Sequence, residues 1–312
     1  MCFLTLSPIY IRLWIAFTLF CLFAYTEDCL ASAPNEKQYR ESSQERLKDE
    51  KPNSRQKEIS PVKTAHPLRQ EFVELTPEKL AYFFQGYEAC FVLLDANTEE
   101  SLRFNPNLCG KRYSPCSTFK IFNSLVGLET GVLKDENSSM VWDGTKYDID
   151  TWNRDQTLQS AVTNSVVWYF QRLASTVGEE RMKQYINKVH YGNEDISGGI
   201  TQFWLGSTLK ISADEQVAFL KGLVRDELPF SKRSMAIARG LLRLVQTEKG
   251  TLYGKTGSSG DNGKYTLGWF VGYVVQPGRI DIFATNIRGR DDASGIKARE
   301  LTEKILKEAG LI

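Results

Sequence analysis

The stretch YTLGWFVGYVVQPGRIDIFATNI, residues 265–287, carries the strongest strand pattern in the chain. Its two halves, 265–276 and 279–287, are rich in aromatic and β-branched residues, which favour strands. Pro277 and Gly278 lie between the halves, and these residue types favour a tight turn. The stretch therefore predicts an antiparallel hairpin.

A block of helices is predicted before this hairpin, from about residue 130 to residue 245. Three segments of the block carry apolar residues at helical spacing: 175–189, 213–224 and 232–247. After the hairpin, residues 295–307 predict an amphipathic helix with Ile296, Leu301 and Ile305 on one side. The pattern changes from helix to strand only once in this half of the chain.

The segment before the helical block predicts a mixture of elements: a helix over 77–85, strands over 90–95 and 101–105, a loop over 107–115 and a helix over 117–129. Pro115 suits the start of that last helix. Strands, then helices, then strands and a closing helix predict an α+β protein. Its antiparallel sheet is flanked by helices, and the all-helical subdomain is inserted between parts of that sheet.

The first 33 residues have the pattern of a secretory signal peptide. Arg12 precedes an apolar run over 13–25, and Ala31-Ser32-Ala33 supplies the small residues of a cleavage site. The run is shorter than the roughly 20 residues that a membrane span needs. We therefore expect export to the periplasm and no stable membrane span after cleavage; an uncleaved N-terminal anchor is the alternative.

Residues 34–70 are mostly charged and polar, and such a segment buries too little apolar surface to offset its ordering entropy. We interpret it as a flexible linker, with a segment that folds on a partner as the alternative. Residues 71–312 then form the catalytic domain, with its helical subdomain at about 130–245. The net charge of +1 across 312 residues argues against a nucleic-acid partner.

Six cysteines are present, and Cys90, Cys109 and Cys116 remain after cleavage at residue 33. Three thiols allow one bridge at most. Cys109 is able to pair with either Cys90 or Cys116, and a fully reduced state is equally compatible with the sequence. No Cys or His pair has the spacing of metal ligands, so we expect no metal site.

Ser117-Thr118-Phe119-Lys120 places a hydroxyl and an amine three residues apart. A serine nucleophile needs a base, and helix residues at i and i+3 share a face. The chain has only two histidines: His66 lies in a charged stretch, and His190 precedes a predicted turn. A Ser-His-Asp triad is therefore disfavoured, and Lys120 is the candidate base for Ser117.

Three further motifs follow in the chain: Ser165-Val166-Val167, Tyr191-Gly192-Asn193 and Lys255-Thr256-Gly257. The order S-x-x-K, S-x-x, K-T-G is that of serine enzymes and binding proteins that react with penicillin. The segment 250–256 (GTLYGKT) resembles a phosphate-binding P-loop, but it has one residue too few and precedes a strand pattern. Nucleotide binding is therefore disfavoured.

With Ser-Val-Val as its second motif and Tyr-Gly-Asn as its third, the chain resembles a class D (oxacillinase-type) serine β-lactamase. The resemblance covers about residues 72–312 and extends to SPCSTFKIFNSLVGLE, VWDG, WNRD, QFWLGSTLKIS, EQVAFL and GWFVGYV. Phe122 stands where the family commonly has proline, and Ser258 where it commonly has a larger residue. The second departure leaves the substrate preference open.

This resemblance implies that Ser117 forms an acyl-enzyme with the β-lactam carbonyl. Lys120 would be the base. Phe119, Val167 and Trp204 would exclude water from its amine, and burial lowers the pKa of an amine. The resemblance further implies that carbon dioxide, supplied as bicarbonate, converts Lys120 into N6-carboxylysine. Trp204 would hydrogen-bond and shield that carbamate, and no other cofactor is implied.

The remaining roles also follow from the resemblance. Ser165 would pass a proton to the departing nitrogen, with Lys255 maintaining its electrostatics. The amides of Ser117 and Ser258 would bind the oxyanion. The substrate-binding residues would be Val167, Trp204, Thr256, Gly257, Ser258 and Arg299. Arg299 is the expected cation for the substrate carboxylate, with Lys297 as the alternative, and Tyr191 and Asn193 would shape the pocket.

The sequence thus predicts hydrolysis of small-molecule β-lactams, and hence antibiotic resistance, by a monomer or homodimer. Two alternatives share the motifs. One is a penicillin sensor domain that stays acylated, and the other is a cell-wall D,D-peptidase. The chain shows neither the several membrane helices of such sensors nor the S-x-N motif usual in the peptidases.

Overall fold

A six-stranded antiparallel sheet is the centre of the protein. The computed structural model describes residues 75–261 and 263–312. The predicted signal peptide, the predicted linker and His66 lie outside these residues. The strand order is β2-β1-β8-β7-β6-β5. The strands are β1 (Glu88–Asp95), β2 (Ser101–Phe104), β5 (Arg243–Gln246), β6 (Thr251–Asp261), β7 (Lys264–Gln276) and β8 (Arg279–Arg288).

The predicted hairpin is confirmed as β7 and β8. The two strands pair antiparallel from Gln276 opposite Arg279 to Leu267 opposite Arg288. Gly278 has a φ of +74° in the connecting turn, a conformation that residues with a Cβ rarely adopt. The turn residues and the strand residues therefore specify the same structure.

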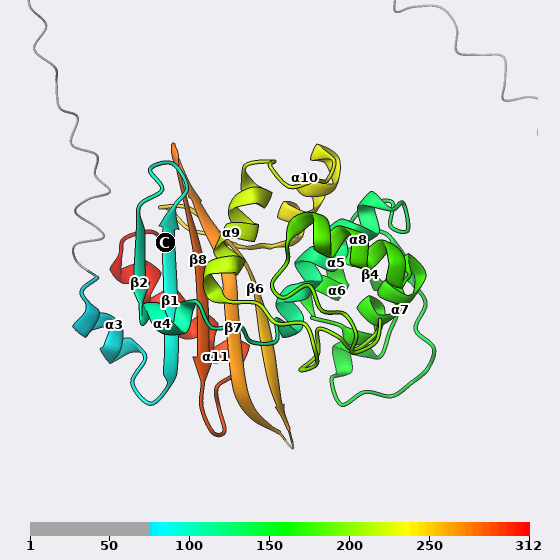
Figure 1. Cartoon of the computed structure of the whole chain (residues 1–312), viewed down its shortest axis with the longest axis horizontal. Helices are drawn as coiled ribbons and strands as arrows, with labels where there is room; N and C mark the ends of the chain where they lie inside the picture. Colours follow the sequence, from blue (N-terminus) through cyan, green and yellow to red (C-terminus); the bar gives the residue numbers. More distant parts are fainter. Residues whose placement is uncertain (1–74, 262) are drawn as a thin grey trace, which may run out of the picture. The chain divides into compact units, whose positions relative to one another are not determined.

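Each face of this sheet is covered by helices (Figure 1). On one face, α3 (Pro77–Phe83) and α11 (Gly295–Glu308) pack on Phe91, Phe270 and Phe283. On the other face, α9 (Ala213–Val224) packs on Val92 and Val271. Alternate residues of β1 and β7 thus enter opposite cores, which explains why both strands are almost continuously apolar.

A group of helices lies beside β6 and completes the α+β fold (Figure 1). It comprises α5 (Lys120–Glu129), α6 (Leu158–Thr163), α7 (Val167–Val177), α8 (Glu179–Val189) and α10 (Lys232–Leu241). Strands β3 (Ser139–Met140) and β4 (Gln156–Thr157) form a small separate pair there.

Two predicted helices were wrong in their limits. The segment 175–189 is divided between α7 and α8 at Gly178, whose φ of +85° ends the first helix. The segment 232–247 stops being helical at Leu241, and residues 243–246 form the edge strand β5 instead. A short apolar run such as LLRLV is compatible with both a helix and a strand. Pairing with β6 makes this segment a strand.

Two smaller expectations also differ from the structure. The predicted loop 107–115 begins with a short helix, α4 (Pro106–Cys109). Ile296 is 77% exposed, whereas Leu301 and Ile305 are buried as expected. Ile296 precedes Leu301 by five residues, which places it about 140° away around the helix and off the buried stripe.

The three cysteines of the described residues are buried free thiols. Cys109 lies beside Cys90. A hydrogen bond between the two thiols lowers the pKa of Cys109 and raises the pKa of Cys90. Cys116 instead donates to the Ser114 carbonyl at 3.5 Å. Of the alternatives left open by the sequence, the structure has the reduced one.

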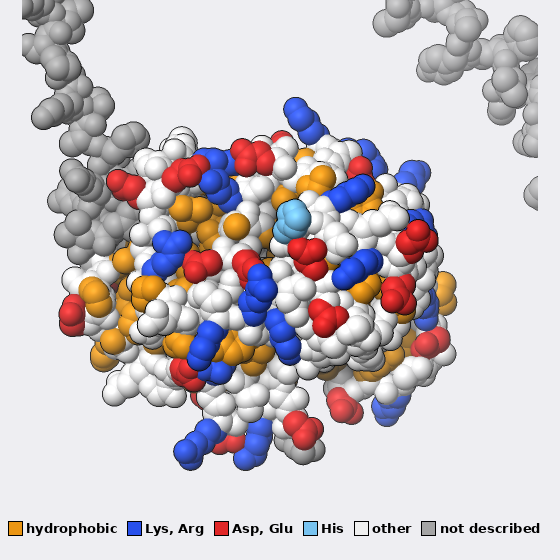
Figure 2. All heavy atoms as spheres, in the orientation of Figure 1, with side chains coloured by type: hydrophobic (Ala, Val, Ile, Leu, Met, Phe, Trp, Pro, Cys, Tyr) orange, Lys and Arg blue, Asp and Glu red, His pale blue; other side chains and the backbone are white. Residues whose placement is uncertain are grey.

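The visible surface carries both signs of charge. Figure 2 shows Lys and Arg side chains interspersed with Asp and Glu on this face. Surface ion pairs of the protein include those of Lys221 and Arg225 with Glu99. This distribution agrees with the near-zero net charge of the sequence.

Candidate active site

Ser117 lies in a tight turn rather than in the α-helix predicted for it. Residues Cys116–Phe119 form a 3₁₀ turn, and α5 begins at Lys120. Cys116 has a φ of +49°, which is a strained conformation for a residue with a side chain. The strain is held in place because Ser114, two residues earlier, is bound to Trp204, Gly206 and Trp269.

Those bonds form a small network around Ser114. Its hydroxyl donates to the Trp204 carbonyl at 2.8 Å and accepts from the Gly206 amide at 2.9 Å. Its own carbonyl accepts from the Trp269 indole at 2.9 Å. The turn that presents Ser117 is therefore tied both to the sheet and to the loop that carries Trp204.

Lys120 contacts Ser117 directly. Its Nζ lies 2.7 Å from Ser117 Oγ, and its side chain is fully buried. Burial, reinforced by the nearby Lys255, lowers the pKa of Lys120 well below its usual value. A lowered pKa makes the neutral amine easier to form, and a neutral amine is able to accept a proton.

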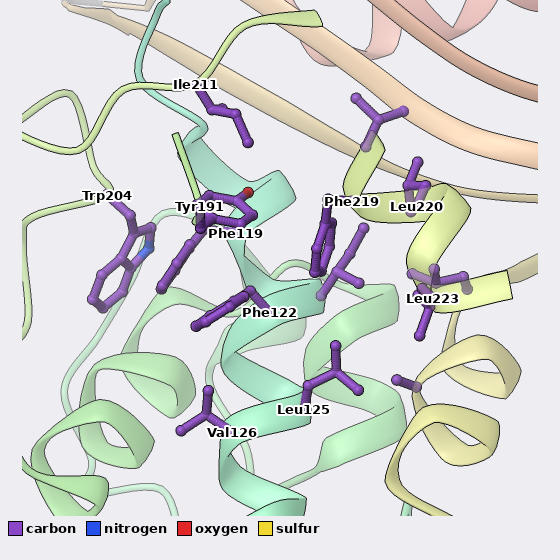
Figure 3. Packing of buried hydrophobic residues seen from close by; sticks show 14 of the residues in the cluster. Phe119, Phe122, Leu125, Val126, Tyr191, Trp204, Ile211, Phe219, Leu220 and Leu223 are labelled. Atoms are coloured by element: carbon purple, nitrogen blue, oxygen red, sulfur yellow. The ribbon is translucent and has the colours of Figure 1, made fainter. Parts of the chain in front are cut away.

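The walls around Lys120 are aromatic. Figure 3 shows Phe119 beside Trp204, and their rings stack with centroids 5.5 Å apart. Lys120 Nζ lies 5.6 Å from the centre of the Phe170 ring. The expected wall residue Val167 is half-buried at the start of α7. Phe170 lies one turn further along α7, and it was missed although i+3 spacing from Val167 pointed to it.

Trp204 brings a polar atom into this apolar surrounding. The side chain is fully buried, and its Nε1 has no hydrogen-bond partner among the described residues. A buried N–H without a partner is uncommon in proteins. The indole is thus a free donor on a residue whose ring lies against Phe119.

A second serine–lysine pair joins distant parts of the chain. Lys255 Nζ donates to Ser165 Oγ at 3.0 Å and to the Thr256 carbonyl at 3.1 Å. Lys255 is on β6, while Ser165 lies between α6 and α7 with a φ of +55°. Burial lowers the pKa of Lys255 to about 7, so both its charged and its neutral forms are populated near neutral pH.

Gly257 allows β6 to approach Ser117. A Cβ at this position would lie 2.9 Å from the Pro115 carbonyl oxygen and 3.2 Å from the Ser117 amide nitrogen. On the other side, a Cβ on Gly295 would lie 2.6 Å from the Gly257 oxygen. The Lys-Thr-Gly motif therefore ends in glycine because the strand passes between the Ser117 turn and the start of α11.

Ser258 continues this contact. Its hydroxyl accepts from the Gly295 amide at 2.8 Å, which fixes the first residue of α11 to β6. The residue is half-buried. The small side chain at this position thus has a hydrogen-bonding role that the sequence did not indicate.

A hollow of about 220 Å³ lies next to Lys255 and Thr256. Its lining residues are Val162, Thr163, Leu241, Arg243, Leu244, Gly254, Lys255, Thr256, Phe270 and Arg299. Arg299 enters this lining with its guanidinium 5.9 Å from the Phe270 ring centre, while Lys297 pairs with Glu300 at 2.6 Å. Arg243, on β5, is a further cation that the sequence interpretation missed because β5 was predicted as helix.

Tyr191 and Asn193 belong to the support of the site. Tyr191 is 1% exposed and packs edge-on against Phe119 and tilted against Phe122 (Figure 3). Asn193 binds the Thr208 carbonyl at 2.9 Å and the Lys210 amide at 2.8 Å. Phe122, where proline was expected, fills part of this aromatic cluster.

His190 lies on the surface, outside the two serine–lysine pairs. His190 is largely exposed and its ring nitrogen lies 3.1 Å from Glu194. Within residues 75–261 and 263–312, no cluster of three or more His, Cys, Asp or Glu side chains is placed to hold a metal ion. In the same part of the chain, no helix combines the length and apolar character needed to cross a bilayer.

The two Ser-Lys pairs meet where β6 passes the Ser117 turn and the turn between α6 and α7, in a fold with helices on both faces of an antiparallel sheet. The family model of the penicillin binding protein transpeptidase domain matches residues 89–307. The "Probable beta-lactamase YbxI" of Bacillus subtilis (strain 168) is 44% identical over 230 residues, which are 73% of this chain and 84% of that protein.

The solved structure of "Class D beta-lactamase BAT-2" aligns with a TM-score of 0.72 and 40% identity, covering 76% of this chain and 99% of that one. The "Regulatory protein BlaR1" of Bacillus licheniformis is 37% identical over 236 residues, which are 75% of this chain but only 39% of that protein. The chain belongs to the class D β-lactamase family.

Proposed function

We propose that the protein hydrolyses the amide bond of β-lactams through an acyl-enzyme on Ser117. The observation that carries this proposal is the 2.7 Å contact between Ser117 Oγ and a fully buried Lys120 Nζ. A buried amine with a lowered pKa is a suitable base for a serine hydroxyl. Similarity to proteins named β-lactamases supports the substrate class.

In the proposed acylation, the base on the Lys120 side chain takes the proton from Ser117 Oγ while that oxygen attacks the lactam carbonyl carbon. The ring C–N bond then breaks, the nitrogen receives a proton from Ser165, and Ser165 Oγ takes a replacement proton from Lys255. Lys255, 3.0 Å from Ser165 Oγ, keeps that hydroxyl oriented and able to donate. The amides of Ser117 and Ser258 are the proposed oxyanion donors, a role supported by the close approach of β6 to Ser117.

We propose that Thr256 and Arg299 hold the substrate carboxylate. Both line the hollow beside Lys255, and a guanidinium binds a carboxylate through two parallel hydrogen bonds. Arg299 Nε donates to Glu303 at 2.6 Å, which helps to fix the orientation of the guanidinium. Gly257 contributes backbone, and Val167 and Trp204 contribute apolar surface near the reacting bond.

We further propose that Lys120 is carboxylated by carbon dioxide, so that its nitrogen forms a C–N bond and releases a proton. The unpartnered N–H of Trp204 supports this, because an added carboxylate would give that donor an acceptor. The resulting anionic oxygen would be the base in both steps: it would take the proton from Ser117 in acylation and from water in deacylation. Apart from carbon dioxide or bicarbonate, the proposal needs no cofactor.

The chain segments outside the described residues also enter the proposal. We propose that residues 1–33 are a signal peptide that directs the protein to the periplasm, that 34–70 are a linker, and that 71–312 are the catalytic domain with its helical part at about 130–245. A monomer or a homodimer fits the same site, since every proposed group comes from one chain.

A penicillin sensor is the second candidate, because the chain is also similar to BlaR1. A sensor would be acylated at Ser117 without releasing the product. Turnover of a chromogenic cephalosporin by the purified protein, with and without bicarbonate, separates the two. We expect steady turnover that bicarbonate increases; one equivalent of product followed by no turnover would assign the sensor function.

The role of Lys120 is tested with Lys120→Ala and with Lys249→Ala, which removes an exposed lysine as the control. We expect Lys120→Ala to accumulate acyl-enzyme, seen as added mass on the intact protein, or to lose acylation altogether. Rapid hydrolysis in this variant would refute the role. The mass of one added carbon dioxide on Lys120 tests the carboxylation separately.

A further inference from the structure

We propose that Trp152 is a positioning residue for Ser165, acting through the backbone carbonyl of Asn164. This inference rests on the proposed role of Ser165 as the proton donor to the leaving nitrogen. Trp152 ends a short 3₁₀ turn, Asp150–Trp152, far along the chain from Ser117 and Lys255. Its indole N–H donates to the Asn164 carbonyl at 2.9 Å.

Ser165 needs such support because its backbone is strained. Its φ of +55° lies in the left-handed region, which residues with a Cβ adopt only when the surrounding structure imposes it. Its amide donates to Val162 at 3.2 Å, and the next amide, of Val166, donates to Ala161 at 2.9 Å. These bonds hold the amide side of the turn but leave the Asn164 carbonyl to another donor.

Trp152 is in turn fixed from the other side of Ser165. The indole N–H of Trp168, in the first turn of α7, donates to the Trp152 carbonyl at 3.0 Å. Trp168 is 6% exposed. The two indoles therefore link Asn164, which precedes Ser165, to Trp168, which follows it, by way of the short 3₁₀ turn that ends at Trp152.

The segment around Trp152 is anchored to α7 by a second set of contacts. Arg172 Nη1 donates to the Val141 carbonyl at 2.6 Å, and its guanidinium lies 5.1 Å from the Trp168 ring centre. The amide of Trp142 donates to Asp155 at 2.9 Å, which closes the segment on itself. The segment around Trp152 supplies no proposed reacting group. It nevertheless fixes the backbone next to Ser165, the proposed proton donor.

The chemical consequence concerns the breaking C–N bond. Proton transfer requires the donor oxygen within hydrogen-bond distance of the leaving nitrogen, and small displacements reduce the rate steeply. If the Asn164 carbonyl is released, the Ser165 turn is free to relax and its Oγ to leave the 3.0 Å contact with Lys255. The Ser117–Lys120 pair lies on a different element and keeps its geometry.

The test replaces Trp152 by Phe, which keeps an aromatic ring and removes the N–H. We expect Trp152→Phe to lower kcat about tenfold, the effect of one lost hydrogen bond, with KM little changed. Trp168→Phe should produce a smaller loss of the same kind. Tyr147→Phe is the control, because that ring packs edge-on to Trp152 at 5.6 Å and neither indole bond involves its hydroxyl.

A double variant distinguishes positioning from a general structural effect. If Trp152 acts through Ser165, Trp152→Phe adds no further loss in the background of Ser165→Ala. A full additional loss, a rise in KM with unchanged kcat, or an unchanged rate would overturn the inference. Ser165→Ala alone tests the proposed function, since a small effect of that variant would refute the proton-donor role whatever Trp152 does.

Discussion

The two serine–lysine pairs differ in how the chain builds them. Ser117 and Lys120 are three residues apart, so one tight turn sets their distance. Ser165 and Lys255 are separated by 90 residues and meet only because β6 passes beside the turn between α6 and α7. The first geometry is local and the second depends on the whole fold, although burial lowers the pKa of both lysines.

The largest expected effect comes from Lys120→Arg, which keeps a positive charge and removes the ability to lose a proton. We expect acylation to slow by about 10³-fold, within the range for a general base. Stopped-flow acylation with a chromogenic cephalosporin measures it. Near-normal acylation in this variant would mean that Lys120 contributes only its positive charge. Lys120 and Lys255 would then have the same kind of electrostatic role.

Lys255→Met should stabilise the protein at neutral pH. In the folded state the pKa of Lys255 is about 7, against about 10.5 in the unfolded chain. Below about pH 7 both states hold the proton and the cost of burying the charge is complete; between about 7 and 10.5 only the unfolded state holds it, so stability rises with pH. The difference between the two pKa values corresponds to about 4 kcal/mol near pH 7, and the loss of the Lys255 bonds to Ser165 and Thr256 offsets about 1 kcal/mol of it. We therefore expect Met to increase the free energy of unfolding by about 3 kcal/mol.

Urea unfolding of both proteins at several pH values measures this difference. The gain from Lys255→Met should shrink as the pH rises toward about 10, because the lysine of the unfolded wild-type chain then loses its proton as well and the two states no longer differ in protonation. A gain that stays constant with pH would contradict the assignment of the effect to Lys255.

Gly257→Ala should separate β6 from the Ser117 turn and so disturb both pairs together. The new Cβ would meet the Pro115 oxygen at 2.9 Å, and overpacking of this kind costs about 1–3 kcal/mol. We expect lower activity and a lower unfolding midpoint. Gly240→Ala is the control, because its Cβ would meet nothing within 4 Å; equal losses in both variants would exclude a specific contact.

The smallest expected effect is a pH dependence carried by Lys255. If its charged form supports Ser165, kcat should fall severalfold on the alkaline side as Lys255 loses its proton near pH 7. Lys255→Arg carries a permanent charge and should remove this decline. A decline that persists in Lys255→Arg has to be assigned to another group.

The same contrast explains what the sequence could predict. The hairpin, α9 and the Ser117–Lys120 pair follow from patterns a few residues long, and local periodicity and spacing are enough to find them. The Ser165–Lys255 pair was found only through resemblance to a family. Arg243 and the bond from Trp152 to Asn164 were missed because each depends on contacts between segments that no local pattern relates. Phe170 was missed although its i+3 spacing from Val167 pointed to it.

The aromatic cluster behind Lys120 has a consequence for how the protein is able to change. Phe119, Phe122, Tyr191 and Trp204 belong to the main core, and Phe119, which stacks on Trp204 and meets Tyr191 edge-on, directly precedes Lys120. A substitution among them alters folding and the reactivity of Lys120 at once, so selection is expected to conserve them jointly. Substitutions that change substrate preference are expected at less buried positions near the site, such as the exposed Arg243 and the half-buried Ser258.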